Sequence, residues 1–209
     1  MEDRKLARSS ILDPRFEAMP TKSSKLEFHP LVPERWRDFE SLFGERGACG
    51  GCWCMWWRIP RSQFNKQKGE KNKKAMKKLV DSGHVPGIIA YQDEQPIAWL
   101  AVAPRESFSV LGGSRILKPV DEKPGWSVVC FFVTKTHRRS GVSVKLLKAA
   151  IDFVREQGGR IIEGYPIEPK KNQPDAFVWT GLAAAFRKAG FKEVLRRSET
   201  RPIMRYEIR

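Results

Sequence analysis

The amino-acid sequence predicts an α+β fold with a mixed β-sheet flanked by helices. Residues 128–133 form an uninterrupted apolar, β-branched and aromatic run, which is typical of a buried central strand, and a helical pattern follows it. Residues 88–103 predict a hairpin. Residues 193–208 supply further short strands. Strands and helices therefore alternate along the chain, with hairpins at both ends.

The composition favours one folded unit. The chain has 209 residues and an ordinary apolar content, enough for one core. Its longest apolar runs are far too short to span a bilayer, and no apolar segment follows the charged N-terminus as a secretory signal requires. Three of the four cysteines fall within six residues, which does not suit a secreted disulfide framework. We therefore expect a cytoplasmic protein with no membrane partner.

The charge is strongly positive and unevenly distributed. The formal net charge of +15 favours an anionic partner, such as a nucleotide, a nucleic acid or an acidic substrate. Residues 58–78 contain nine lysines and arginines, and Glu70 is their only acidic neighbour. A solvated helix face is the favoured interpretation of this stretch. A surface that contacts nucleic acid is the alternative.

The first part of the chain divides into a leader and the start of the domain. Residues 1–24 are polar, charged and aperiodic, so we expect a flexible leader, within which Met19 is a candidate alternative start. Residues 25–209 then form a single domain. Its first elements are a short strand over residues 25–29, a helix over residues 36–43 that ends at Gly44, and a second helix over residues 70–81.

The later elements follow from turn residues and periodicity. Residues 108–125 contain paired glycines and two prolines, which predicts a mobile loop. Beyond the central strand, the pattern predicts a helix to residue 157, a strand over residues 160–165, a polar loop over residues 170–175 and a helix over residues 177–189. Closing strands over residues 193–195 and 203–208 complete the chain.

A basic loop that contains a glycine joins the central strand to the helix after it. The first turn of a helix presents backbone N–H groups without partners, and the helix dipole makes that end positive. Gly141 lets a phosphate approach the backbone, and Arg138 and Arg139 add charge-assisted hydrogen bonds. The loop therefore predicts a diphosphate cradle, although the glycine patterns of the Walker and dinucleotide loops are missing. A plain solvated turn is the alternative.

The order of these motifs resembles that of the GNAT N-acetyltransferases. Arg138-x-x-Gly141-x-Ser143 is similar to the family's acetyl-CoA motif, Gln/Arg-x-x-Gly-x-Gly/Ala, with a small serine at the last position. Residues 184–191 resemble the family's late helix and its Gly-Phe exit, and residues 87–100 its early hairpin. The resemblance covers about residues 25–208. It implies a mixed, mostly antiparallel sheet flanked by helices, and acetyl transfer from acetyl-CoA, as cosubstrate, to an amine acceptor.

The resemblance also implies a binding site for the cosubstrate. In the family the central strand aligns the pantetheine and offers backbone N–H groups to the thioester, while the loop wraps the pyrophosphate. The corresponding residues here are Phe131, Phe132, Val133, Arg138, Arg139, Ser140, Gly141, Val142 and Ser143.

The sequence offers candidates for proton transfer on the strand beside the central one. Glu163 is the candidate base that takes the amine proton, and a carboxylate exposed on a strand is the alternative. Tyr165 is the candidate acid, and a half-buried core tyrosine is the alternative. The family's usual tyrosine acid falls on Phe186, which has no proton to give. Cys130 lies in an apolar strand, where burial would make its thiol inert.

The cysteine-rich stretch carries little evidence for a metal site. Cys49-x-x-Cys52-x-Cys54 supplies three thiols, whereas structural zinc usually takes four ligands and a second pair is missing. We therefore expect no bound metal, and treat these residues as apolar fillers. By the resemblance this stretch borders the acceptor pocket, where Trp53, Trp56 and Trp57 would form an aromatic wall.

Three functions remain compatible with the sequence. The leading hypothesis is an acetyl-CoA-dependent N-acetyltransferase. A basic nucleic-acid-binding protein has the required charge, but its tryptophans cluster rather than interleave with the basic stretch and no binding motif is present. A GNAT-like module that binds CoA without turnover is the third hypothesis.

Overall fold

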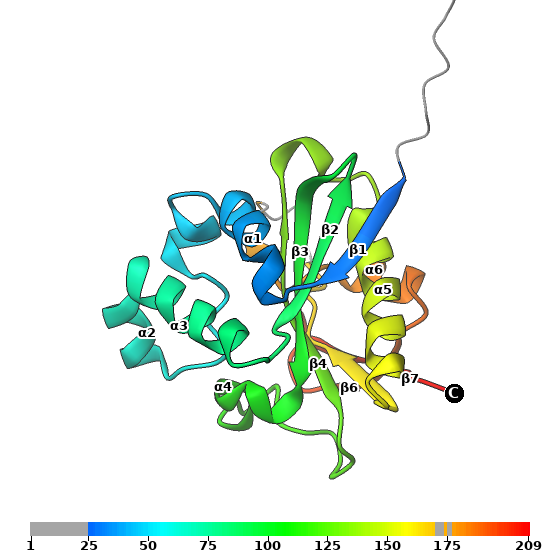
Figure 1. Ribbon diagram of the computed structural model, residues 1–209. Helices are drawn as coiled ribbons and strands as arrows, with labels where there is room; N and C mark the ends of the chain where they lie inside the picture. The colour runs from blue at the N-terminus through cyan, green and yellow to red at the C-terminus, as the bar shows by residue number, and fades with distance from the viewer. Residues whose placement is uncertain (1–24, 170–173, 175–176) are drawn as a thin grey trace, which may run out of the picture.

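The computed structural model describes residues 25–169, 174 and 177–209 (Figure 1). The leader predicted over residues 1–24, with Met19, lies outside this part of the chain, and so does the polar loop predicted over residues 170–175, apart from residue 174. The strands are β1 (Leu26–Pro30), β2 (Gly87–Gln92), β3 (Gln95–Pro104), β4 (Trp126–Val133), β5 (Ile161–Gly164), β6 (Lys192–Arg196) and β7 (Pro202–Glu207). The α-helices are α1 (Trp36–Phe43), α2 (Arg61–Gln67), α3 (Glu70–Asp81), α4 (Ser109–Gly112), α5 (Val142–Glu156) and α6 (Ala183–Lys188).

The seven strands form one sheet in the order β1-β2-β3-β4-β5-β7-β6. Every neighbouring pair is antiparallel except β4 and β5, which run parallel. Figure 1 shows α1, α2 and α3 on one side of the sheet, and α5 and α6 on the other. The mixed, mostly antiparallel sheet flanked by helices that the sequence predicts is therefore confirmed.

The β2–β3 hairpin shows how local sequence sets the register. Asp93 and Glu94 both adopt positive φ, 49° and 63°, as the two central residues of a tight hairpin turn do. Alternate side chains of the two strands then enter opposite layers of the core. Ile89 and Trp99 pack with α1 and α3, whereas Ile88 and Leu100 pack with α5.

Helix α5 follows the central strand β4, as its apolar spacing predicts. Its buried residues include Leu146, Leu147 and Val154, which pack on the sheet. Gly141 occupies the N-cap with a left-handed φ of 82°, a conformation that favours glycine, and Gly158 ends the helix region with φ 75°. The helix therefore begins at the basic loop, as expected.

Strand β4 pairs with β5 only over the first part of β4. The parallel register joins Trp126–Val128 of β4 to Ile162–Gly164 of β5, and β4 continues to Val133 beyond the last of these pairs. On its other edge β4 stays paired with β3 to its end, with a register shift between Ala101 and Val102. The two central strands thus separate at the level of Val129.

The helix predicted over residues 177–189 is wrong in its first half. Helix α6 covers only Ala183–Lys188, and the chain before it turns at Gly181, where φ is 87°. The backbone of this turn bonds largely to other segments: Phe131 N–H donates to Trp179 O at 2.7 Å and Ile167 bridges to Leu182, while Gly181 N–H donates to Val178 O within the turn at 2.8 Å. Unpaired groups of β4 and the segment after β5 therefore outcompete the local helical pattern.

Two short helices were not predicted. Helix α2 lies in the basic stretch. Phe64 is the only buried residue of this helix, so its sequence has no clear apolar periodicity. Helix α4 interrupts the loop predicted over residues 108–125 and buries Leu111. None of the helices in the described residues combines the length and the apolar character needed to cross a membrane.

Candidate active site

A cavity of about 1100 Å³ opens where β4 and β5 separate. At one end it is lined by the end of β4, the loop before α5, the first turn of α5 and part of α6. At the other end it is lined by residues from the segment 43–68, which includes Cys52, Trp56 and Phe64. The cavity therefore joins the two faces of the sheet.

The loop before α5 borders the cavity with basic side chains and a glycine. Arg138 and Arg139 are exposed, and Arg138 Nε donates to Val133 O at 3.1 Å. Ser140 Oγ donates to His137 O at 2.6 Å, which fixes the turn. A Cβ at Gly141 would meet no atom within 4 Å, so steric crowding is not the reason for a glycine at this position. The reason is its left-handed φ, which favours glycine. The open N-terminus of α5 can accept an anion.

The structure brings together eight of the nine residues predicted for the cosubstrate site. Ser140 bonds within its own turn and does not line the cavity. The cavity lining includes the other eight: Phe131, Phe132, Val133, Arg138, Arg139, Gly141, Val142 and Ser143.

The backbone of β4 at the cavity is already engaged by the chain itself. Phe131 N–H belongs to the strand segment, Phe131 to Val133, whose N–H groups the family resemblance offers to the thioester, and it donates to Trp179 O at 2.7 Å. Gly181 lies against the rings of Phe131 and Phe186, so the turn over residues 178–182 fits closely to β4. This turn occupies the edge of β4 that β5 has left.

The structure does not bring Glu163 or Tyr165 into the cavity lining. Glu163 is buried, with 5% of its surface exposed, and accepts hydrogen bonds from Arg205 Nε at 2.9 Å and Nη2 at 2.7 Å. Asp121 also accepts from Arg205, at 2.7 Å, and these hydrogen bonds raise the pKa of the guanidinium above its ordinary value. The alternative of an exposed strand carboxylate is therefore wrong.

Tyr165 belongs to the same buried cluster. Its hydroxyl lies 2.9 Å from Ser127 Oγ and 3.3 Å from Glu163 Oε2, and Arg105 donates to it. Burial, and then the negative charge of Glu163, raise the pKa of Tyr165 above its ordinary value. A phenol whose pKa is raised is a weaker acid, so this environment does not favour proton donation.

Phe186 is fully buried and does not line the cavity. Its ring packs against β5, where a Cβ at Gly164 would overlap it, and edge-on against Phe131 at 5.9 Å. The position of the family's tyrosine is thus filled by an apolar core side chain.

All four cysteines of the chain line the cavity, which was not expected of Cys130. Cys130 is only partly buried, and its Sγ lies 3.5 Å from Cys54 Sγ, to which Trp99 Nε1 donates at 2.8 Å. The hydrogen bond between Cys52 and Cys54 is the main cause that raises the pKa of Cys52, and burial is the main cause that raises the pKa of Cys54. Among the described residues, no three His, Cys, Asp or Glu side chains are grouped so that they could hold a metal ion.

The aromatic wall differs from the one implied by the resemblance. Trp56 lines the cavity, but Trp53 is buried against Phe43, and Trp57 is buried with its Nε1 donating to Val129 O at 3.1 Å. Trp179, which falls within the helix that was wrongly predicted, supplies the missing surface, with its ring 5.8 Å from that of Trp56.

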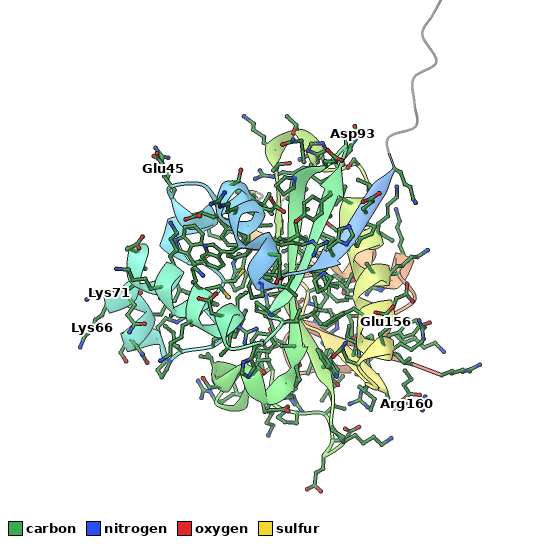
Figure 2. The ribbon with its side chains drawn as sticks, viewed as in Figure 1. Glu45, Lys66, Lys71, Asp93, Glu156 and Arg160 are labelled. Carbon is green, nitrogen blue, oxygen red and sulfur yellow. The ribbon has the colours of Figure 1, made fainter. Side chains whose placement is uncertain are left out.

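The basic stretch lies on the outer surface of α2 and α3. Figure 2 shows Lys66 and Lys71 directed away from the sheet into solvent. Several of its lysines have acidic partners within the chain, such as Lys77, whose Nζ lies 2.7 Å from Asp81 Oδ1. These features match a solvated helix face, the favoured interpretation of this stretch.

Solved structures with the same fold are known in several organisms. A GNAT-family protein from Desulfovibrio desulfuricans is 15% identical, with 88% of this chain and 100% of that chain covered and a TM-score of 0.51. The PaiA N-acetyltransferase from Thermoplasma acidophilum, in complex with coenzyme A, is 13% identical over 88% and 99% of the two chains, with a TM-score of 0.50. A GNAT acetyltransferase from Listeria monocytogenes is 8% identical over 87% and 94%, with a TM-score of 0.53.

Sequence comparison gives the family directly. No curated protein matches the chain. The family model described as "Acetyltransferase (GNAT) family" matches residues 53–174, which is more than half of the chain and includes the basic loop and α5. The chain therefore belongs to the GNAT acetyltransferase family.

Proposed function

We propose that the protein is an acetyl-CoA-dependent N-acetyltransferase that transfers the acetyl group to an amine of an acceptor. The observation that carries this proposal is the cavity at the separation of β4 and β5. It connects a basic helix N-terminus, suited to a diphosphate, with an aromatic pocket on the other face of the sheet. The complex of coenzyme A with the Thermoplasma protein of the same fold supports the choice of cosubstrate.

The cosubstrate's diphosphate would bind at the start of α5. Backbone N–H groups of the first turn and the exposed guanidinium groups of Arg138 and Arg139 all carry positive charge there. The pantetheine would then follow β4 past Val133 toward Phe131. Eight of the nine proposed contact residues line the cavity, and Ser140 would act by fixing the turn.

The reaction needs a donor for the oxyanion and a neutral amine. We assign the donor to Phe131 N–H, which would exchange Trp179 O for the thioester oxygen. The amine nitrogen then forms a bond to the thioester carbon, the carbon–sulfur bond breaks, CoA leaves as the thiolate and the amine loses a proton. CoA thiolate is a good leaving group near neutral pH, so the phenylalanine at position 186 does not preclude turnover.

Glu163 and Tyr165 remain the sequence candidates for proton transfer, but their surroundings favour another role. The carboxylate and the hydroxyl are both engaged within a buried cluster, and neither side chain lines the cavity. We propose that they are positioning residues, which fix β5 against β4 and β7 at the level where the two central strands begin to separate.

Binding without turnover is the second candidate function. The observation in its favour is that Phe186 replaces the family's acid and that no aspartate or glutamate is found among the described residues that line the cavity. Detection of an acetylated product separates this candidate from the enzyme. A nucleic-acid-binding function rests on the charge of α2 and α3 alone and is not favoured.

Thermal unfolding with acetyl-CoA tests the proposal. A ligand that binds only the native state, at a hundred times its Kd, stabilises it by about 2.7 kcal/mol, which for a chain of this size raises Tm by roughly 5–10 °C. Gly141→Ala and Arg138→Glu should each remove most of this shift. If saturating acetyl-CoA leaves the wild-type Tm unchanged, the proposal fails.

Gly158 provides a matched control for Gly141. Both glycines have left-handed φ, 75° at Gly158 and 82° at Gly141, both flank α5, and a Cβ at either meets no atom within 4 Å. Gly158→Ala and Gly141→Ala should therefore lower the Tm of the free protein by similar amounts. Only Gly141→Ala should abolish the acetyl-CoA shift, which separates phosphate binding from backbone strain.

Two further expectations belong to the proposal. Residues 25–209 would form one domain, since all seven strands of the described residues join one sheet. The protein would work in the cytoplasm, where thiols stay reduced, and its four free cysteines support that location.

A further inference from the structure

The acceptor end of the cavity is built from aromatic rings. Trp56 stands perpendicular to Phe64 at 5.0 Å and to Trp179 at 5.8 Å between ring centroids. Phe64 is buried, whereas Trp56 and Trp179 are only partly buried and line the cavity. Partly exposed indole rings in a concave site favour a flat, apolar body that packs against them.

The charges around these rings are positive. The Arg61 guanidinium carbon lies 3.0 Å from the centre of the Trp56 ring, and Lys68 lines the cavity with its Nζ 5.9 Å from the Phe64 ring. Among the described lining residues, Arg138, Arg139 and Lys188 lie at the diphosphate end of the cavity, and no acidic side chain balances Lys68 at the aromatic end. A cationic acceptor would be repelled from this site, whereas an acceptor that carries an anionic group would be attracted.

The cavity also offers little to deprotonate a basic amine. Its described lining contains no carboxylate, and Glu163 is held by Arg205 outside it. The imidazole of His137 does line the cavity, but it belongs to the loop at the diphosphate end, and its Nδ1 lies 2.8 Å from Thr134 Oγ1 and 3.0 Å from Thr136 Oγ1. An alkyl amine as basic as lysine is neutral in only about one molecule in 2,500 at pH 7. An amine attached directly to an aromatic ring is already neutral there.

From these three features we propose that the acceptor is a weakly basic aromatic amine with an acidic substituent, of the aminobenzoate class. This inference rests on the proposed acetyltransferase function. The ring packs against the parts of Trp56 and Trp179 that line the cavity, and the acidic group lies toward Lys68, with the Arg61 guanidinium beside Trp56 adding positive charge. The amine lone pair attacks the thioester carbon, the C–N bond forms as the C–S bond breaks, and the product amide releases one proton to solvent.

Paired probes test each part of the inference with the full chain. 4-Aminobenzoate and 4-(aminomethyl)benzoate share the ring and the carboxylate and differ in the basicity of the amine, while 4-aminobenzamide keeps the aromatic amine without the negative charge. Acetylated product is quantified by chromatography at pH 7. We expect kcat/KM for 4-aminobenzoate to exceed that for each analogue at least tenfold, and spermidine to give no product.

The pH profile separates basicity from fit. Between pH 6 and 9 the rate with 4-aminobenzoate should stay flat, because its amine is neutral throughout. The rate with 4-(aminomethyl)benzoate should rise about tenfold per pH unit over the same range, as its neutral fraction grows.

Variants locate the binding groups. Lys68→Gln should raise KM for 4-aminobenzoate at least fivefold and leave KM for the uncharged benzamide unchanged. Lys71→Gln, which changes a lysine directed into solvent, is the matched control and should alter neither constant (Figure 2). Trp56→Leu should raise KM for both aromatic amines, with Trp56→Phe restoring most of the loss, and should leave the acetyl-CoA shift in Tm intact.

The outcomes distinguish the two proposals. If acetyl-CoA stabilises the protein but spermidine or 4-(aminomethyl)benzoate is the better acceptor at pH 7, the acceptor class is wrong and the acetyltransferase function stands. Acetyl-CoA binding with no acetylation of 4-aminobenzoate at millimolar concentration overturns the acceptor class as well. Failure of acetyl-CoA to bind removes the function and the inference together.

Discussion

Nη2 of Arg205 lies 2.7 Å from Oε1 of Glu163, in a pair whose side chains are each less than a tenth exposed. The two residues face each other across the β5–β7 register, with Arg105 3.8 Å from the second carboxylate oxygen. Removal of the Glu163 carboxylate would leave the buried Arg205 with only Asp121 of its acidic partners Asp121 and Glu163 and would take the ion pair from Arg105, which makes this contact a sensitive point of the fold.

Glu163→Gln should therefore destabilise the protein. We expect a loss of about 3 kcal/mol, or roughly 6–12 °C in Tm for a chain of this size. Glu207→Gln, which changes an exposed carboxylate on the same strand as Arg205, should alter Tm by less than about 2 °C. Differential scanning calorimetry of the three proteins measures both effects.

Kinetics of Glu163→Gln decide between a base and a positioning residue. If Glu163 positions the strands, Glu163→Gln measured at temperatures below its unfolding transition should show the same pH dependence of kcat/KM as the wild type. Its affinity for acetyl-CoA should also be unchanged. A drop of about a hundredfold or more in kcat, together with loss of the acidic limb of that profile, would identify Glu163 as the base after all.

Phe186→Tyr tests whether the missing hydroxyl matters. The ring is fully buried and packs on Gly164 and Gly181, so a hydroxyl there lacks an evident partner and should cost about 1–3 kcal/mol of stability. Acetyl-CoA affinity should stay nearly unchanged, and turnover should change modestly. Phe177→Tyr, at a side chain that is 60% exposed, is the control for the hydroxyl itself. Activity that arises only in Phe186→Tyr would show that the natural protein is a binder.

The four thiols should react in an order set by exposure and pKa. Cys49 is exposed, whereas burial raises the pKa of Cys54 and so keeps its thiol protonated. Iodoacetamide at pH 8, followed by mass spectrometry of peptides, should label Cys49 first and Cys54 last, with Cys49→Ser removing the fast phase. Equal rates for Cys49 and Cys54 in the native protein would contradict the buried placement of Cys54.

Acid should weaken the contact between the segment after β5 and the strand β6. Hydrogen bonds from Arg187 and then Arg196 lower the pKa of Glu168 below its ordinary value. Its contribution to stability is therefore complete above the unfolded-state pKa of about 4.3 and is lost as the pH falls through the lower folded-state pKa. The Tm difference between wild type and Glu168→Gln should be largest near pH 7 and shrink as the pH falls below the unfolded-state pKa. Glu122→Gln, at an exposed loop carboxylate, is the surface control and should change Tm little.

Local sequence patterns predicted most of the fold because most elements bury one regular face. The helix predicted over residues 70–81 is found with those bounds, and β4 and α5 lie where the apolar spacing put them. The turn before α6 was missed because part of its hydrogen bonding goes to β4, which precedes it by more than forty residues, and part to Ile167 after β5. Periodicity within a segment carries no information about such a distant partner.

The candidate site also contains a part that local sequence predicts and a part that depends on distant contacts. The loop from Arg138 to Ser143 is contiguous in sequence, so its residues could be assembled from the motif alone. Glu163 could not be placed, because the partner that buries it, Arg205, lies 42 residues further along the chain. The aromatic wall combines Trp56 and Trp179, which only the fold brings to 5.8 Å.

The hydrogen bond from Phe131 N–H to Trp179 O has a thermodynamic consequence for cosubstrate binding. If the thioester takes that N–H, as proposed, the turn over residues 178–182 acts as an internal competitor for it. The observed Kd for that bound state then equals the intrinsic Kd divided by the fraction of molecules in which the turn has left β4. Free CoA has no acyl oxygen for this N–H and leaves the turn in place. The turn would therefore open when acetyl-CoA binds and close again once the acetyl group has been transferred and CoA remains.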